Sequence, residues 1–138
     1  MTEGGDLDKL GRGTVWRNEI PDCLHQNHVF AVRPRLDALD PDYLALLTET
    51  SHARAYFEST GVKTTNLAST NSSKVLDLPV PVVSLETQRG FVRRVLEARG
   101  TTETLATSLE RQIGLLIEHR QALIATAVIG ELDLWEAA

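Results

Sequence analysis

The chain has 138 residues and a formal net charge of −5, and apolar residues make up 42% of it. This composition supports a packed core and argues against wholesale disorder. The charge is −3 over residues 1–83 and −2 over residues 84–138, so neither part offers the broad basic face that non-specific nucleic-acid binding requires. Because the sequence has neither an apolar run of about 18 residues nor a signal-type N-terminus, no membrane partner and a cytoplasmic location are expected.

Cysteine and histidine usage argues against a metal centre. Cys23 is the single cysteine, so neither an internal disulfide nor a cysteine-based zinc site can form, and we expect this side chain to be half-buried. His25 and His28 could share a loop, but no third ligand accompanies them. The sequence therefore predicts no metal ion and no cofactor.

Two short strands are predicted in the first quarter of the chain. Residues 11–17 are typical of a glycine turn that enters a strand, and we expect Trp16 to pack in the core or at a sheet edge. Residues 28–33 are β-branched and aromatic and are stopped by Pro34, which predicts a second strand. The two strands could form a hairpin with a long loop.

A helix is predicted to start at residues 40–42. Asp40 can cap its free amides, Pro41 suits its first turn and Asp42 complements its dipole. Apolar residues share one face up to Phe57, and Gly61 lies just past the end.

The residues between this helix and the next are polar at first and then proline-rich. In residues 63–74, Ser72 or Ser73 could cap one short turn. Residues 78–83 contain prolines at alternate positions, which allow an edge strand or an extended segment but not a central strand.

A long helix is predicted over residues 84–127, with Ser84 as its cap. Gly100 and Gly114 are weak points at which this helix could kink or break, and Gly130 ends it before a short tail. Apolar residues follow a helical spacing along one side, widened by Ile117 and Ile124. Because a domain of about 80 residues cannot cover so long a stripe, we expect a partner helix in a coiled-coil-type contact. The predicted interface residues are Leu105, Leu109, Ile113, Leu116 and Leu123.

Three blocks of this sequence resemble one protein family. Residues 78–81 (Leu-Pro-Val-Pro) and 85–88 (Leu-Glu-Thr-Gln), followed by a long helix, resemble the end of a target-recognition domain in the specificity subunits of type I restriction-modification systems. Residues 120–133 resemble the end of that family's long helix. Thr87 and Ile129 depart from the family pattern, which usually has Glu and Thr there.

The third block lies upstream, where residues 13–17, 26–28 and 32–34 resemble the later strands of a recognition domain. The blocks follow the family order and cover most of the chain. The chain begins in what resembles the middle of such a domain, so a fragment, a misplaced start or a degraded gene is expected.

The resemblance implies an α+β protein in which residues 1–83 form a partial DNA target-recognition domain and residues 84–138 form the long helix with a short tail. It implies double-stranded DNA and the methyltransferase subunits as partners, and the restriction-translocase subunit indirectly. The helix would pair with a second recognition half or with another copy of the chain. Base edges in the major groove are read by Arg, Lys, Asn, Gln, Ser or Thr side chains on loops that a rigid scaffold holds. The candidate DNA-contacting residues are Arg12, Arg17, Gln26, Asn27, His28, Lys63 and Asn66.

No catalytic motif accompanies this resemblance. The sequence lacks a methyltransferase motif, a glycine-rich cofactor loop, a nuclease-type acidic cluster with lysine and a Walker motif. We therefore expect no enzyme activity, and catalysis would reside in other subunits. The alternative is a truncated helical interaction module that associates through its helix and reads no DNA.

Overall fold

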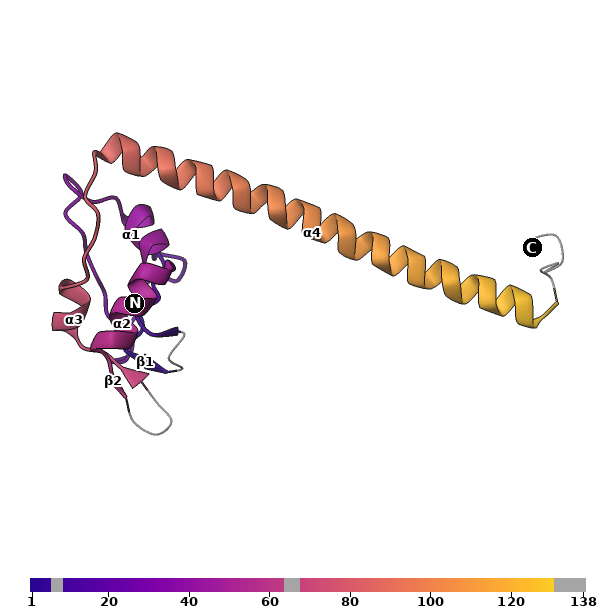
Figure 1. Cartoon of the computed structure of the whole chain (residues 1–138), viewed down its shortest axis with the longest axis horizontal. Coiled ribbons are helices and arrows are strands. Elements are labelled where there is room, and N and C mark those ends of the chain that lie inside the picture. The colour runs from indigo at the N-terminus through magenta and orange to yellow at the C-terminus, as the bar shows by residue number, and fades with distance from the viewer. Residues whose placement is uncertain (6–8, 64–67, 131–138) are drawn as a thin grey trace. The chain divides into compact units, whose positions relative to one another are not determined.

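The computed structural model describes residues 1–5, 9–63 and 68–130 (Figure 1). It divides into two compact units, Met1–Arg94 and Val95–Ala138. The described chain is mostly helical and carries a long C-terminal helix, as the sequence predicts. In chain order the elements are β1 (Gly4–Gly5), α1 (Pro41–Thr48), α2 (Ser51–Thr60), β2 (Val62–Lys63), β3 (Ala68–Ser69), α3 (Ser72–Leu76) and α4 (Leu85–Val128).

The sheet is small and antiparallel, in the order β1-β3-β2. Gly4 and Val62 both pair with Ser69, one from each side of β3. The two strands predicted over residues 11–17 and 28–33 are wrong, because the structure forms no strand in either segment. Both segments lie beside the N-terminal residues.

In place of the predicted hairpin, both segments make backbone hydrogen bonds to the first residues of the chain. The amide of Thr2 donates to the carbonyl of Arg12 at 3.0 Å, and the amide of Phe30 donates to the carbonyl of Met1 at 2.8 Å. A single isolated bridge joins Thr2 and Val29. Isolated bonds of this kind do not build a ladder, which is why a β-type sequence gives irregular backbone here. Cys23 is exposed, so its predicted half-burial is wrong, and Trp16 is 54% exposed and does not lie in the core.

The core of the first unit is centred on Phe57, which is fully buried among Leu10, Ala53, Ala68, Val75 and Leu78. Gly11 allows this packing, because a Cβ at its position would lie 2.2 Å from the Phe57 ring. The same glycine has a φ of 72°, a backbone conformation that side chains other than glycine disfavour.

The single helix predicted from Asp40 to Phe57 is two helices. Asp40 caps α1 as predicted, and its Oδ1 accepts from the amides of Asp42 and Tyr43. Thr50 is extended and accepts from the amide of Ala53 to cap α2. Threonine hydroxyls compete for backbone groups in this way, which explains the break. Gly61 ends α2 as predicted.

Residues 78–83 form neither a helix nor a strand, so the edge strand that their prolines would allow is not formed. Side chains of α1 and α2 bond to the backbone of this linker and of the residues just before it. Tyr43 donates to the carbonyl of Pro81 at 3.2 Å, Tyr56 donates to the carbonyl of Lys74 at 2.9 Å, and His52 Nε2 lies 3.2 Å from the carbonyl of Pro79. The short turn that precedes the linker is α3, and its cap is Asn71 rather than a serine.

The long helix α4 has 44 residues and is about 66 Å long at 1.5 Å per residue. The Ser84 hydroxyl accepts from the amide of Thr87 at 3.2 Å and caps its start. The helix runs through Gly100 and Gly114, the two predicted weak points, without a break. A helical glycine costs about 1 kcal/mol, and the helix formers around it offset that cost. The helix is followed by Gly130, whose φ is 78°.

Candidate functional site

Arg12 and His28, two of the candidate DNA-contacting residues, lie on either side of the N-terminal segment. The amide of Thr2 bonds to the carbonyl of Arg12, and the amide of Glu3 bonds to the carbonyl of His28 at 3.0 Å. Both candidate side chains are exposed. His28 Nδ1 lies 2.9 Å from Glu3 Oε2, so part of its hydrogen-bonding capacity is used within the chain.

Arg17 is tied to the start of α1 rather than free in a loop. Its guanidinium forms an ion pair with Asp42, and its backbone amide donates to Glu19 Oε2 at 2.9 Å. The Arg17 side chain is 62% exposed, so much of it remains available to solvent.

The remaining candidates are spread over three segments. Gln26 and Asn27 are exposed in a turn, in which the carbonyl of Gln26 accepts from the amide of Val29. Lys63 lies in β2, at the opposite edge of the sheet from β1. Asn66 lies outside the described residues, as does the tail expected after Gly130. The structure thus brings Arg12 and His28 together and does not gather all candidates on one element.

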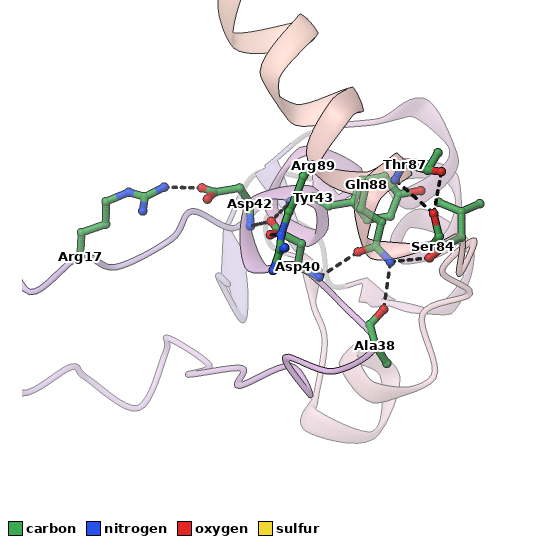
Figure 2. A network of polar contacts seen from close by, with 10 residues as sticks. Arg17, Ala38, Asp40, Asp42, Tyr43, Ser84, Thr87, Gln88 and Arg89 are labelled. Carbon is green, nitrogen blue, oxygen red and sulfur yellow. Dashed lines mark hydrogen bonds and ion pairs between the residues drawn. The ribbon is translucent and has the colours of Figure 1, made fainter.

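Gln88 forms a buried polar junction that the sequence reasoning did not single out (Figure 2). Its Oε1 accepts from the amide of Asp40 at 2.8 Å, and its Nε2 donates to the carbonyls of Ala38 at 2.9 Å and Val83 at 2.7 Å. The side chain has no exposed surface. One amide therefore joins the loop before α1, the linker before α4 and the first turns of α4. Gln88 lies in residues 85–88, which resemble a known family, and this resemblance is the sequence feature that could have pointed to it.

Neighbouring contacts reinforce this junction. Arg89 Nε lies 3.5 Å from Asp40 Oδ2, and the Asp40 side chain is only 16% exposed. The rings of Tyr43 and Phe91 meet edge to face with centroids 5.9 Å apart. Asp40 thus caps α1, donates its backbone amide to Gln88 and pairs with α4 through its second oxygen.

Two groups of the first unit, the Asp37 carboxyl and the Met1 amino group, have shifted pKa values. Hydrogen bonding to Arg35 lowers the pKa of the exposed Asp37 carboxyl. Burial lowers the pKa of the Met1 amino group, which donates to the carbonyl of Phe30 at 2.9 Å.

Among the described residues no group of three or more metal-type ligands gathers at one place. Within the same residues, no helix is both long and apolar enough to cross a membrane.

The apolar stripe predicted on α4 is exposed along its whole length. Leu116, at its centre, is 67% exposed, and beyond Val92 none of the described helix is buried. Soluble monomers rarely leave so continuous an apolar surface uncovered. All five predicted interface residues lie on this stripe and are exposed, namely Leu105, Leu109, Ile113, Leu116 and Leu123.

No protein-family model, no curated protein and no solved structure matches this chain. The polar junction at Gln88 and the uncovered stripe on α4 are therefore the two features from which a function can be argued.

Proposed function

We propose that the chain is the C-terminal part of a DNA sequence-specificity subunit of a type I restriction-modification system, with no catalytic site of its own. The observation that carries the proposal is the junction at Gln88, in the block 85–88 that resembles this family. A buried amide there anchors a long helix to a small folded unit. Such an anchor suits a subunit that must hold a recognition domain at a fixed position on a helical spacer.

The two parts have different roles in this proposal. Residues 1–83 form a partial recognition domain of an α+β protein and supply side chains for double-stranded DNA. The α4 stripe docks the methyltransferase subunits, and through them the restriction-translocase subunit, or pairs with a second recognition half or another copy of the chain. The complex works in the cytoplasm, and this chain holds no cofactor.

The charge distribution supports a few placed contacts rather than a basic surface. With a net charge of −5, affinity from phosphate contacts alone would be weak. Arg17, Gln26 and Asn27 are exposed and lie in non-helical segments, where base-reading side chains are commonly found. A base-reading contact is worth about 1–3 kcal/mol of discrimination, whereas a phosphate contact affects all sequences alike.

Alanine substitutions in a reconstituted complex test the proposal. Arg17→Ala, Gln26→Ala, Asn27→Ala, Lys63→Ala and Asn66→Ala are each assayed for DNA affinity, sequence preference and salt dependence. We expect at least one to relax sequence preference by about 1–3 kcal/mol. Arg54→Ala, an exposed arginine on α2, is the control and should leave both properties unchanged. Five variants that all behave like the control would reject these residues as the DNA interface.

The absence of catalysis is tested separately. Purified chain supplied with S-adenosylmethionine, ATP and magnesium should neither methylate nor cut DNA, and the reconstituted complex is the positive control. Reproducible methyl transfer by the chain alone would contradict the proposal.

A second candidate is an interaction module that reads no DNA. The observation that favours it is that Arg17 and His28 already pair with acidic side chains of the chain itself, Asp42 and Glu3. In that case the complex would form through α4, but its sequence preference would be the same with and without residues 1–83. Measuring DNA preference with a complex built on α4 alone, beside the full chain, separates the two candidates.

A further inference from the structure

We infer that Arg17 reads one guanine of the DNA target in the major groove, and that Asp42 is the residue that positions the Arg17 guanidinium for this contact. The inference rests on the function proposed above, and it adds the base that is read and the group of the chain that orients the reading side chain. It follows from the contacts of Arg17, from the way the start of α1 is held, and from the local charge.

Arg17 is held at its backbone and at the tip of its side chain, and most of the side chain is still in solvent. Its amide donates to Glu19 Oε2 at 2.9 Å, and its Nη2 donates to Asp42 Oδ1 (Figure 2). The side chain is 62% exposed. A guanidinium carries five N–H donors in a planar fork, and the pair with Asp42 engages only Nη2. Donors on Nε and Nη1 therefore remain for a ligand.

The Asp42 carboxylate has a defined place, because the start of α1 is held by the polar junction at Gln88. The amide of Asp42 donates to Asp40 Oδ1 at 3.0 Å, and the amide of Asp40 donates to Gln88 Oε1 at 2.8 Å. Arg89 Nε lies 3.5 Å from the other carboxylate oxygen of Asp40. A short side chain on a capped helical turn has few orientations. Asp42 thus fixes one corner of the guanidinium fork and reduces the entropy that Arg17 loses when it binds a base.

The local charge favours a neutral acceptor over a phosphate. The carboxylates of Glu19 and Asp42 both contact Arg17, so two anions surround one cation and the net charge is negative. A phosphate in the same place would be repelled by both carboxylates. The phosphate backbone is therefore a poor ligand for this arginine.

Guanine is the base whose major-groove edge matches the remaining donors. This edge is uncharged and presents two acceptors, N7 and O6, at the spacing of the guanidinium fork. Adenine has a donor beside its N7 and would leave an arginine N–H without a partner. The pyrimidines present at most one acceptor there.

A carboxylate that merely withheld Arg17 from DNA would behave differently from one that positions it. Removal of a withholding carboxylate would raise the affinity for every DNA sequence alike. Removal of a positioning carboxylate lowers the discrimination at one base pair, while the affinity for unrelated DNA stays the same or rises. The substitution Asp42→Asn separates these two roles.

Reading of guanine is tested with the full chain reconstituted with a methyltransferase subunit. Selection from a randomised duplex gives the recognised sequence, and each guanine in it is then replaced by adenine or by 7-deazaguanine, which lacks N7. For the wild-type complex, replacement of one guanine by adenine should weaken binding by about 5- to 150-fold, and 7-deazaguanine at the same place should also weaken it. Arg17→Ala and Arg17→Lys should both abolish these losses, since lysine keeps the charge but not the fork.

The role of Asp42 is tested at the same guanine. Asp42→Asn should reduce the discrimination against adenine by about fivefold or more and should not weaken binding to unrelated duplex. In an Arg17→Ala chain the same change should leave discrimination unaltered, because the two residues act as one unit. Asp77→Asn removes another exposed carboxylate of the same unit, at the end of α3, and is the matched control. Circular dichroism of each variant verifies that it is folded.

The possible results distinguish this inference from the proposed function. An equal gain in affinity for all sequences in Asp42→Asn would show that Asp42 withholds Arg17, and would overturn its positioning role. A recognised sequence in which no guanine responds to Arg17→Ala would overturn the inference and leave the proposed function intact, because other loops would then carry the sequence preference. A wild-type complex without any sequence preference would overturn both.

Discussion

Gln88 illustrates how one buried amide can replace many apolar contacts at a junction. It satisfies one backbone amide and two carbonyls that have no ladder or helix partner. Substitution by Gln88→Ala leaves these groups unpaired and opens a void. We expect a loss of about 2–4 kcal/mol in the free energy of unfolding, measured by urea denaturation. Gln121→Ala, at an exposed position of the same helix, is the matched control and should change stability by less than about 0.5 kcal/mol.

Gly11 tests the packing around Phe57. An alanine there would place its Cβ 2.2 Å from the ring and would have to adopt a φ of 72°. Gly11→Ala should therefore destabilise the first unit by about 2 kcal/mol or more, seen as a lower Tm of the near-ultraviolet transition. An unchanged Tm would mean that the loop before Arg12 packs elsewhere in solution.

At the scale of elements, substitution of the α4 glycines should raise stability, whereas Gly11→Ala should lower it. Nothing lies within 4 Å of a Cβ built on Gly100 or Gly114, and both residues are helical. Gly100→Ala and Gly114→Ala should each stabilise the helix by about 1 kcal/mol. Thermal melting followed by circular dichroism at 222 nm measures this. A decrease in helicity would indicate that the glycines are needed for close contact with a partner.

The helices could be predicted more fully from the sequence than the remaining backbone. The cap at Asp40 and the long run from Ser84 follow from local chemistry, and the structure confirms both. The predictions of strands over residues 11–17 and 28–33 were wrong because a strand forms only beside a partner strand. The strand propensity of the residues does not determine whether such a partner is present. The break at Thr50 was missed because a threonine can either continue a helix or cap a new one.

The candidate site could be predicted only in part. The stripe on α4 follows from residue spacing, and its five residues are exposed as a docking surface requires. The block 85–88 pointed to Gln88, but its contacts could not be predicted, because its partners at Ala38, Asp40 and Val83 are backbone groups brought together only by folding. The DNA contacts remain predictions, since side-chain type alone does not say which loops face a ligand.

At the scale of the whole molecule, Leu116→Asp should abolish association through α4. Leaving an unpaired charge in an apolar seam costs several kcal/mol, whereas the unit Met1–Arg94 does not use this residue. Sedimentation should show the wild-type chain as a dimer, or as a complex with a methyltransferase subunit, and the variant as a monomer with an unchanged Tm. Leu115→Asp is the matched control, because Leu115 is also exposed but lies off the stripe. A wild-type chain that is monomeric at high concentration and ignores the methyltransferase subunit would leave the stripe without a role.

The first turns of α4 belong to the folded unit, where Gln88 and Val92 are buried, and the later turns are exposed. Starting a helix from coil is unfavourable by about a thousandfold, whereas adding a residue to an existing helix costs almost nothing. The folded unit therefore acts as a nucleus from which α4 propagates, and the helix frays from its far end. Amide hydrogen exchange in the unpartnered chain should be slowest near Val92 and progressively faster toward Val128. A partner that binds the far half would suppress this gradient, and part of its binding energy would go into completing the helix.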